Sequence, residues 1–205
     1  MEVQRIPVGP LAENAYLAWE GGEGVVLDPG AEPEALEAAI REAGFTPKAI
    51  LLTHAHFDHV GAVAPLAETH GLPVYLHAAE LEPYRRAPEI ARAYGLEVPP
   101  PPKPAGFLDE GDEAFGFRVL HLPGHSPGHL AFYAPEAGVI FVGDVLFKGA
   151  VGRYDLPGAD REALWHSLTR LTKLPEDTRV FPGHGEPTTI GSEKRTNPFL
   201  LGGLP

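Results

Sequence analysis

The segment Thr53-His54-Ala55-His56-Phe57-Asp58-His59 carries three imidazoles and one carboxylate within seven residues. It follows directly on the apolar run Ala49–Leu52, which predicts a buried strand. Neutral imidazole and carboxylate are nitrogen and oxygen ligands that suit zinc, iron or manganese. Side chains two apart on an extended chain share a face and lie about 6.6 Å apart, a span that one cation can bridge. The segment therefore predicts a metal-binding loop.

Three further candidate ligands lie downstream, each in a turn that contains Gly or Pro. They are His125 in the sequence Leu-Pro-Gly-His, Asp144 in Val-Gly-Asp and His184 in Phe-Pro-Gly-His-Gly. Seven ligands exceed the four or five that one ion needs, and a shared carboxylate can hold two ions about 3.5–4 Å apart. We therefore expect two divalent ions, zinc first with iron or manganese as alternatives. A closed structural zinc site would need only four ligands.

Composition narrows the classes of function. The 205 residues carry a formal net charge of −12 and no run of basic residues longer than Arg85-Arg86, which disfavours binding to nucleic acid. No apolar run approaches the roughly 20 residues that span a bilayer, and the N-terminus lacks a basic segment followed by an apolar one. The absence of cysteine excludes thiolate ligands and a cysteine nucleophile. We expect a cytoplasmic protein that acts on a small molecule and binds no membrane.

Strand and helix patterns alternate along the chain. Strands are expected at residues 16–19, 25–28, 49–53, 74–77, 115–122, 130–133, 139–142 and 179–181, and helices at 33–43, 60–70, 79–94 (interrupted near Pro83 and Pro88) and 160–174. The proline-rich stretch 99–104 reads as a stiff crossover inside one domain that spans residues 1–205, because candidate ligands fall on both sides of it. Two β-rich halves with helices outside predict an α/β/β/α sandwich of two mixed sheets, with the ligands on strand-end loops.

These motifs resemble the metallo-β-lactamase fold superfamily, and within it the glyoxalase II-like hydrolases, also called hydroxyacylglutathione hydrolases. The resemblance runs from the turn Leu27-Asp28-Pro29-Gly30 to Asn197-Pro198-Phe199-Leu200. It implies that His54, His56 and His125 bind one metal, that Asp58, His59 and His184 bind a second, and that Asp144 bridges both.

The expected activity is hydrolysis of a thioester such as S-lactoylglutathione. A hydroxide that bridges two metals would attack the carbonyl carbon, and a thiolate can leave without a proton donor. Asp58 is the expected catalytic residue, because a carboxylate beside the hydroxide can hold its proton and orient it; a plain ligand is the alternative. Rival activities are an iron persulfide dioxygenase with one metal, which belongs to a sister group, and hydrolysis of another ester or a lactone.

The resemblance also implies a substrate-binding residue. In glyoxalase II a basic residue at the position of Arg153 holds a carboxylate of glutathione, and the planar fork of Arg suits that pairing. Two positions later such enzymes often have tyrosine, whereas this chain has Asp155, so an ion pair between Arg153 and Asp155 or Asp160 is the alternative. The resemblance also implies that Asp28 supports the metal loop, with a plain turn-forming role as the alternative, and either His121 or His129 could orient a ligand. Phe57 could face the substrate or pack beneath the loop, and His70, His77 and His166 lie outside the ligand turns.

Overall fold

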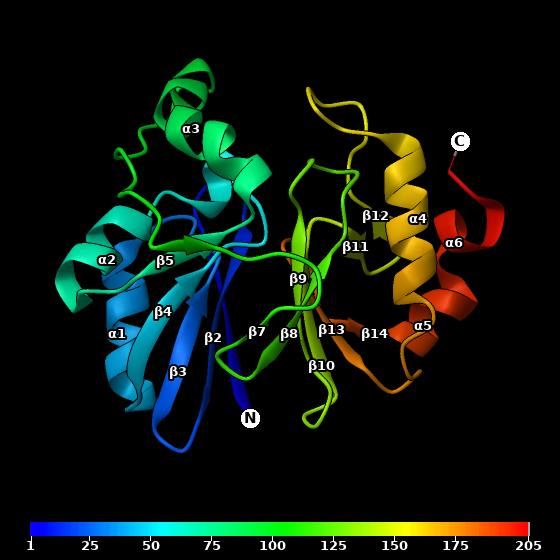
Figure 1. Cartoon of the computed structure of the whole chain (residues 1–205), viewed down its shortest axis with the longest axis horizontal. Coiled ribbons are helices and arrows are strands. Elements are labelled where there is room, and N and C mark those ends of the chain that lie inside the picture. The colour runs from blue at the N-terminus through cyan, green and yellow to red at the C-terminus, as the bar shows by residue number, and fades with distance from the viewer. Residues whose placement is uncertain (205) are drawn as a thin grey trace. The chain divides into compact units, whose positions relative to one another are not determined.

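A computed structural model describes residues 1–204, and the chain divides into two compact units. The first unit comprises Met1–Leu108 and the second begins at Asp109, a few residues after the proline-rich stretch. The expectation of a single domain over residues 1–205 stays a prediction. Each unit contains one mixed sheet with its own helices, as Figure 1 shows.

The sheet of the first unit has the strand order β1-β2-β3-β4-β5-β6. Its strands are β1 (Glu2–Val8), β2 (Glu13–Glu20), β3 (Glu23–Leu27), β4 (Thr46–Leu51), β5 (Val74–Leu76) and β6 (Gly106–Phe107). Strands β1, β2 and β3 pair antiparallel, whereas β3, β4, β5 and β6 pair parallel. The carboxyl ends of β1, β3, β4 and β5 therefore meet at one edge, which is where open α/β sheets place their ligand sites.

The helices of the first unit are α1 (Pro33–Ala43), α2 (Val63–His70) and α3 (Leu81–Ala93), with short 3-10 turns η1 (Phe57–His59) and η2 (Ala78–Glu80). Figure 1 shows α1 and α2 beside the sheet, and Leu36, Ile40 and Leu66 from them belong to one apolar core with Leu17 and Val26. Gly44 and Gly71 cap α1 and α2 in the left-handed conformation, as the sequence predicts.

The expected interruption of the third helix is wrong, because α3 continues through both of its prolines. Pro83 lies in the first turn, where the backbone N–H has no partner within the helix, so its loss costs little. Pro88 removes one interior hydrogen bond without ending the helix. Packing of Tyr84, Ala87 and Ala91 in the core of the first unit holds the helix together.

The sheet of the second unit has the order β14-β13-β10-β9-β8-β7. Its strands are β7 (Glu113–Ala114), β8 (Phe117–His121), β9 (Leu130–Ala134), β10 (Val139–Gly143), β13 (Arg179–Pro182) and β14 (Thr188–Thr189), and β11 (Leu146–Phe147) and β12 (Ala150–Val151) form a separate hairpin. Only β10 and β13 pair parallel; β8 and β9, and β9 and β10, are antiparallel. Strands β8, β10 and β13 therefore run in the same direction and end at the same edge.

The helices of the second unit are α4 (Arg161–Leu171), α5 (Ile190–Thr196) and α6 (Pro198–Gly202). Asp160 caps α4 by accepting a hydrogen bond from the backbone N–H of Ala163 at 2.9 Å. Leu164 and Leu168 of α4 pack with Val142 and Val180 in a second apolar core. The predicted elements do not include β1, the two-residue strands β6, β7, β11, β12 and β14, or helices α5 and α6, because each of these is short or weakly patterned.

The expected fold class is confirmed: the chain is α/β, with two mixed sheets and helices. Among the residues that the structure describes, no helix is both long and apolar enough to cross a membrane.

Candidate metal centre

The residues 53–59, here called the metal loop, leave the carboxyl end of β4 in the first unit. Asp28 directly follows the neighbouring strand β3 and has a left-handed φ of 46°. This turn brings its carboxylate over the start of the loop, where Oδ1 accepts the backbone N–H of Thr53 at 2.7 Å and Oδ2 accepts the Thr53 hydroxyl at 2.6 Å. The expected supporting role of Asp28 is therefore seen in its contacts, which fix the backbone of the metal loop.

A second buried carboxylate holds the loop two residues further on. Glu80, at the end of η2, accepts the backbone N–H of Ala55 at 3.0 Å and is fully buried. Sequence reasoning missed Glu80, because nothing in its neighbourhood distinguishes it from an ordinary glutamate of a helix. The loop is thus held by side-chain acceptors from β3 and η2, two elements that are distant in the sequence.

Hydrogen bonds orient His54 within the loop. Its Nδ1 lies 3.1 Å from the Thr53 hydroxyl, and its Nε2 lies 3.0 Å from Nδ1 of His56. Two nitrogens that each lie 2.0–2.1 Å from a tetrahedral zinc are themselves about 3.3 Å apart. The separation of the two imidazole nitrogens therefore fits a pair of ligands of one ion.

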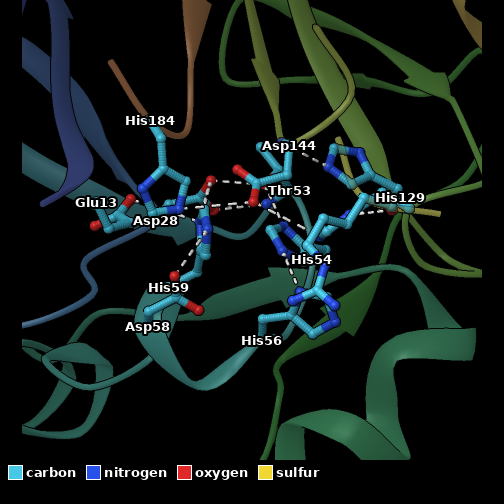
Figure 2. Close-up of polar contacts among 12 residues, drawn as sticks. Glu13, Asp28, Thr53, His54, His56, Asp58, His59, His129, Asp144 and His184 are labelled. Atoms are coloured by element: carbon cyan, nitrogen blue, oxygen red, sulfur yellow. Dashed lines mark hydrogen bonds and ion pairs between the residues drawn. The ribbon is translucent and has the colours of Figure 1, made fainter. Parts of the chain in front are cut away.

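His59 is oriented in the same way by two carboxylates. Its Nδ1 lies 3.2 Å from Oδ2 of Asp28 and 3.5 Å from Oε1 of Glu13, while its Nε2 lies 3.9 Å from Oδ2 of Asp58 (Figure 2). A carboxylate on one ring nitrogen is the usual support for a histidine that binds metal through the other. Glu13 was not anticipated from the sequence, where it reads as the polar start of a strand, yet it is 1% exposed.

The second unit gathers the other three candidate ligands around one carboxylate oxygen. Oδ2 of Asp144, just after β10, lies 3.6 Å from Nε2 of His125 and 3.6 Å from Nε2 of His184. His125 lies between β8 and β9, and His184 follows β13. A carboxylate that faces two imidazoles, each beyond hydrogen-bond distance, is suited to share metal ions with both.

Backbone contacts hold these turns in place. The Nδ1 of His125 lies 2.9 Å from the carbonyl oxygen of Arg153, which directs Nε2 toward Asp144. The backbone N–H of Asp144 donates to Nε2 of His129 at 3.1 Å (Figure 2), so the expected supporting role of His129 has a direct contact behind it. His121 supports the turn between β8 and β9 that carries His125, since its Nε2 lies 2.9 Å from the Pro127 carbonyl oxygen.

Gly152 allows the chain after β12 to approach the ligands closely. A Cβ at this position would overlap the carbonyl oxygen of Asp144 and lie 3.3 Å from Nδ1 of His125. Gly124, with a φ of 136°, has the same function toward α4, because a Cβ there would overlap the backbone of Leu164. These turns of the second unit can therefore approach their neighbours only because positions 124 and 152 carry no Cβ.

Arg153 pairs with a neighbour in the chain. Its Nε and one terminal nitrogen donate to the two carboxylate oxygens of Asp155 at 2.9 Å each, and both side chains are about two-thirds exposed. The Arg153 guanidinium holds the pKa of the Asp155 carboxyl below its usual value. This is the ion pair named above as the alternative, so a substrate carboxylate at Arg153 would have to compete with Asp155.

Phe57 and the histidines outside the ligand turns pack, cap a helix or lie on the surface. Phe57 is buried and its ring centroid lies 5.1 Å from that of Tyr94. His77 caps η2 by accepting the backbone N–H of Ala79 at 3.1 Å. His166 is exposed on α4 beside Glu162, and His70 ends α2. None of these contacts involves a candidate ligand.

The residues fit the implied metal ions by their donor set. In each unit, imidazole nitrogens and carboxylate oxygens from separate turns face one another, and His54, His59 and His125 each have Nδ1 held by an oxygen atom. Such a set, made only of nitrogen and oxygen donors, suits zinc, iron or manganese. The identity of the metal does not follow from it.

Comparison with known proteins identifies the class. A sequence profile of the metallo-beta-lactamase superfamily matches residues 8–184, and the chain belongs to that superfamily. The chain is 40% identical to hydroxyacylglutathione hydrolase GloC of Haemophilus influenzae, over 98% of each sequence. The coarse expectation of a metal-dependent hydrolase is thereby confirmed.

Two solved structures are similar over nearly the whole chain. The crystal structure of TTHA1623 in a di-iron-bound form is 61% identical with a TM-score of 0.93, and it covers 96% of this chain and 100% of its own. The crystal structure of the BLEG-1 B3 metallo-beta-lactamase is 42% identical with a TM-score of 0.90, covering 97% and 99%. The fold is thus shared by proteins named for different chemistry.

Proposed function

We propose that this protein is a dinuclear metal-dependent hydrolase that cleaves a thioester such as S-lactoylglutathione. The assignment of ligands rests on the family resemblance: His54, His56 and His125 for one ion, Asp58, His59 and His184 for the other, with Asp144 shared. The observation that carries the proposal is the position of Asp144, whose Oδ2 lies 3.6 Å from imidazole nitrogens of two different proposed ligand sets.

The bound ions would lower the pKa of water toward about 7 and stabilise negative charge on the carbonyl oxygen of the substrate. Asp58 orients the attacking water and accepts its proton on a carboxylate oxygen, a role open to it because its side chain is 16% exposed. Asp28 and Glu13 lie beside Nδ1 of His59, and its Nε2 is on the side of Asp58, 3.9 Å from Oδ2. The C–S bond then breaks, and the thiolate leaves without needing a proton.

Similarity to GloC supports the glutathione thioester as the first substrate to test. The relative with two irons makes iron a candidate beside zinc and manganese. The name of BLEG-1 makes a β-lactam the natural comparison substrate, because it too offers a carbonyl carbon to attack. A small molecule remains the proposed partner, given the charge of −12.

The test combines metal analysis with thiol release. Metal-free protein is loaded separately with zinc, manganese and iron(II), and each form is measured for metal content and for hydrolysis of S-lactoylglutathione and of a chromogenic β-lactam. We expect two ions per chain and thiol release. A saturated protein that holds one iron and consumes oxygen with a persulfide would instead make it a dioxygenase.

Substitution His184→Ala sharpens the test of two metals. We expect the variant to bind one ion, because His54, His56, His125 and Asp144 remain for the other. His166→Ala is the matched control, since His166 is exposed on α4 and should leave both ions bound. If His184→Ala still bound two ions, the assignment of His184 would be wrong.

A further inference from the structure

A cavity of about 270 Å³ lies in the first unit at the carboxyl edge of its sheet. Its walls come from the turn between β1 and β2 (residues 8–11), the turn between β3 and α1 (residues 30–33) and the segment 96–99 after α3. Phe57 and Asp58 of the metal loop complete the wall. The cavity therefore reaches the residue proposed to direct the attack on the carbonyl carbon.

The wall is mostly apolar. The residues that form it include the aliphatic Val8, Leu11, Leu96 and Val98 and prolines from the same segments. Leu11 is 49% exposed, so the cavity remains accessible from one side. Apolar walls with a few polar groups are typical of sites that bind small organic groups.

Apart from Asp58, the proposed metal ligand, the ionisable residues of the wall are Glu32 and Glu97, which are both acidic. No lysine, arginine or histidine is among the residues that form the cavity. Glu32 is held in place, because its Oε1 accepts the backbone N–H of Gly9 at 2.9 Å. A carboxylate at the far end of an acyl chain would meet the like charges of Glu32 and Glu97, and no basic residue of the wall would offset them, which disfavours it.

Size limits the occupant further. Pockets that hold drug-sized molecules range from about 300 to 1,000 Å³, so this cavity is slightly smaller than the smallest of them. It suits a short chain of carbon atoms and not a whole peptide-like thiol carrier. The part of a thioester that is short, variable and attached directly to the attacked carbon is its acyl group.

We propose that this cavity binds the acyl group of the substrate and selects neutral, apolar acyl chains over chains that carry a carboxylate. The inference rests on the proposed thioester hydrolysis and adds the class of acyl group to it. Arg153 plays no part in it, because it lies in the second unit and would contact the thiol carrier.

The experiment uses thioesters of N-acetylcysteamine, an uncharged thiol, so that only the acyl group varies. We expect kcat/KM of the metal-loaded enzyme to rise about three- to fourfold for each methylene from acetyl to hexanoyl, the factor for burial of one methylene. Succinyl should react more slowly than butyryl. A kcat/KM that does not depend on chain length, or that favours succinyl, would overturn the proposal.

Two variants test the wall directly. Val98→Phe narrows the cavity and should reduce the preference for hexanoyl over acetyl by about tenfold, the loss of burial for two methylenes. Glu97→Lys should raise kcat/KM for succinyl relative to butyryl, whereas Glu42→Lys, an equal change of charge at an exposed position of α1, should not. Equal effects of the two lysine variants would show that only net charge matters.

A binding measurement separates this proposal from the proposed function. Hexanamide and hexanoate are titrated into zinc-loaded protein, and methyl NMR signals of Val8, Leu11 and Val98 are followed. We expect hexanamide to shift them in the wild type, more than hexanoate does and more than in Val98→Phe. Shifts without any thioester hydrolysis would refute the proposed function alone, and hydrolysis without shifts would refute the cavity alone.

Discussion

The two units hold their candidate ligands by different means. The metal loop of the first unit carries four candidate ligands in six consecutive residues, 54–59, and buried carboxylates of Asp28 and Glu80 fix its backbone. The second unit collects three candidate ligands from three separate turns, and backbone contacts such as that from His125 to the Arg153 carbonyl position them. The contiguous motif of the first unit is thus positioned by side chains that are distant in the sequence. The dispersed candidate ligands of the second unit are positioned by backbone segments that approach them closely.

This difference decides which substitutions harm each group. In the first unit, loss of an acceptor leaves buried donors without a partner, and the cost is that of an unsatisfied polar group. In the second unit, an added side chain at a glycine forces the backbone apart, and the cost is that of overpacking. Of the substitutions below, Asp28→Ala and Gly152→Ala test this contrast directly, and Asp58→Asn and Arg153→Ala test one proposed functional residue in each unit.

Asp58→Asn should have the largest effect, because it alone removes a group proposed to take part in the reaction. We expect kcat for a thioester to fall about 10²- to 10⁴-fold, the usual contribution of a positioned acid or base, with little change in KM. Asp177→Asn, at an exposed position of the second unit, is the control. Near-native turnover by fully metal-loaded Asp58→Asn would show that this aspartate is only a replaceable ligand.

Asp28→Ala should destabilise the first unit. It removes the acceptor of two hydrogen bonds from Thr53, and we expect the free energy of unfolding to fall by about 2–4 kcal/mol. Denaturant unfolding of the metal-free protein measures this without any contribution from bound ions. Asp28→Asn, which tolerates the left-handed φ of 46° and keeps one acceptor oxygen, should lose less. Equal losses in the two variants would argue that the charge of Asp28 matters more than its hydrogen bonds.

Gly152→Ala should act on the second unit. The new Cβ would overlap the carbonyl oxygen of Asp144, and we expect a loss of about 1–3 kcal/mol together with weaker metal binding. Gly202→Ala is the matched control, because a Cβ there meets no atom within 4 Å. Calorimetric unfolding and metal titration of both variants give the comparison, and an unchanged metal affinity in Gly152→Ala would contradict it.

Arg153→Ala should have the smallest effect, because Asp155 already occupies the guanidinium. For a thioester that carries a carboxylate on its thiol we expect KM to rise roughly three- to tenfold. This is less than the tenfold or more that a charge-assisted hydrogen bond contributes, because the guanidinium must first leave Asp155. Asp155→Asn should lower the same KM by releasing the arginine. A neutral thioester should respond to neither change, and if both substrates respond alike, Arg153 has only a structural role.

The sequence was most informative where local chemistry decides the structure. Helix α1 begins at Pro33 and ends before Gly44 as predicted, because proline favours the first turn of a helix and glycine a left-handed cap. Helix α2 begins at Val63 instead of residue 60, because the chain after His59 is still occupied by turns. The composition of residues 53–59 predicts a metal-binding loop, and the structure places this segment at the carboxyl end of β4 as expected.

Tertiary contacts could not be predicted in the same way. Glu13 and Glu80 are buried carboxylates beside the metal loop, yet each lies more than 20 residues from the loop residue it contacts. The need for glycine at position 152 follows only from the approach of its backbone to Asp144. The pairing of Arg153 with Asp155 was foreseen as an alternative, because two residues of opposite charge lie two positions apart.

The turn between β1 and β2 has a consequence for how such a protein can diversify. Residues 9–12 form a turn in which the backbone N–H of Ala12 donates to the Gly9 carbonyl oxygen at 3.1 Å. None of these four residues pairs in the sheet or belongs to the apolar core of the first unit. Mutations at Pro10 or Leu11 can therefore accumulate at little cost in folding, while they reshape one wall of the cavity. With the acyl group bound in this cavity, as proposed, the range of acyl groups accepted can change from one lineage to the next while the metal loop stays unchanged.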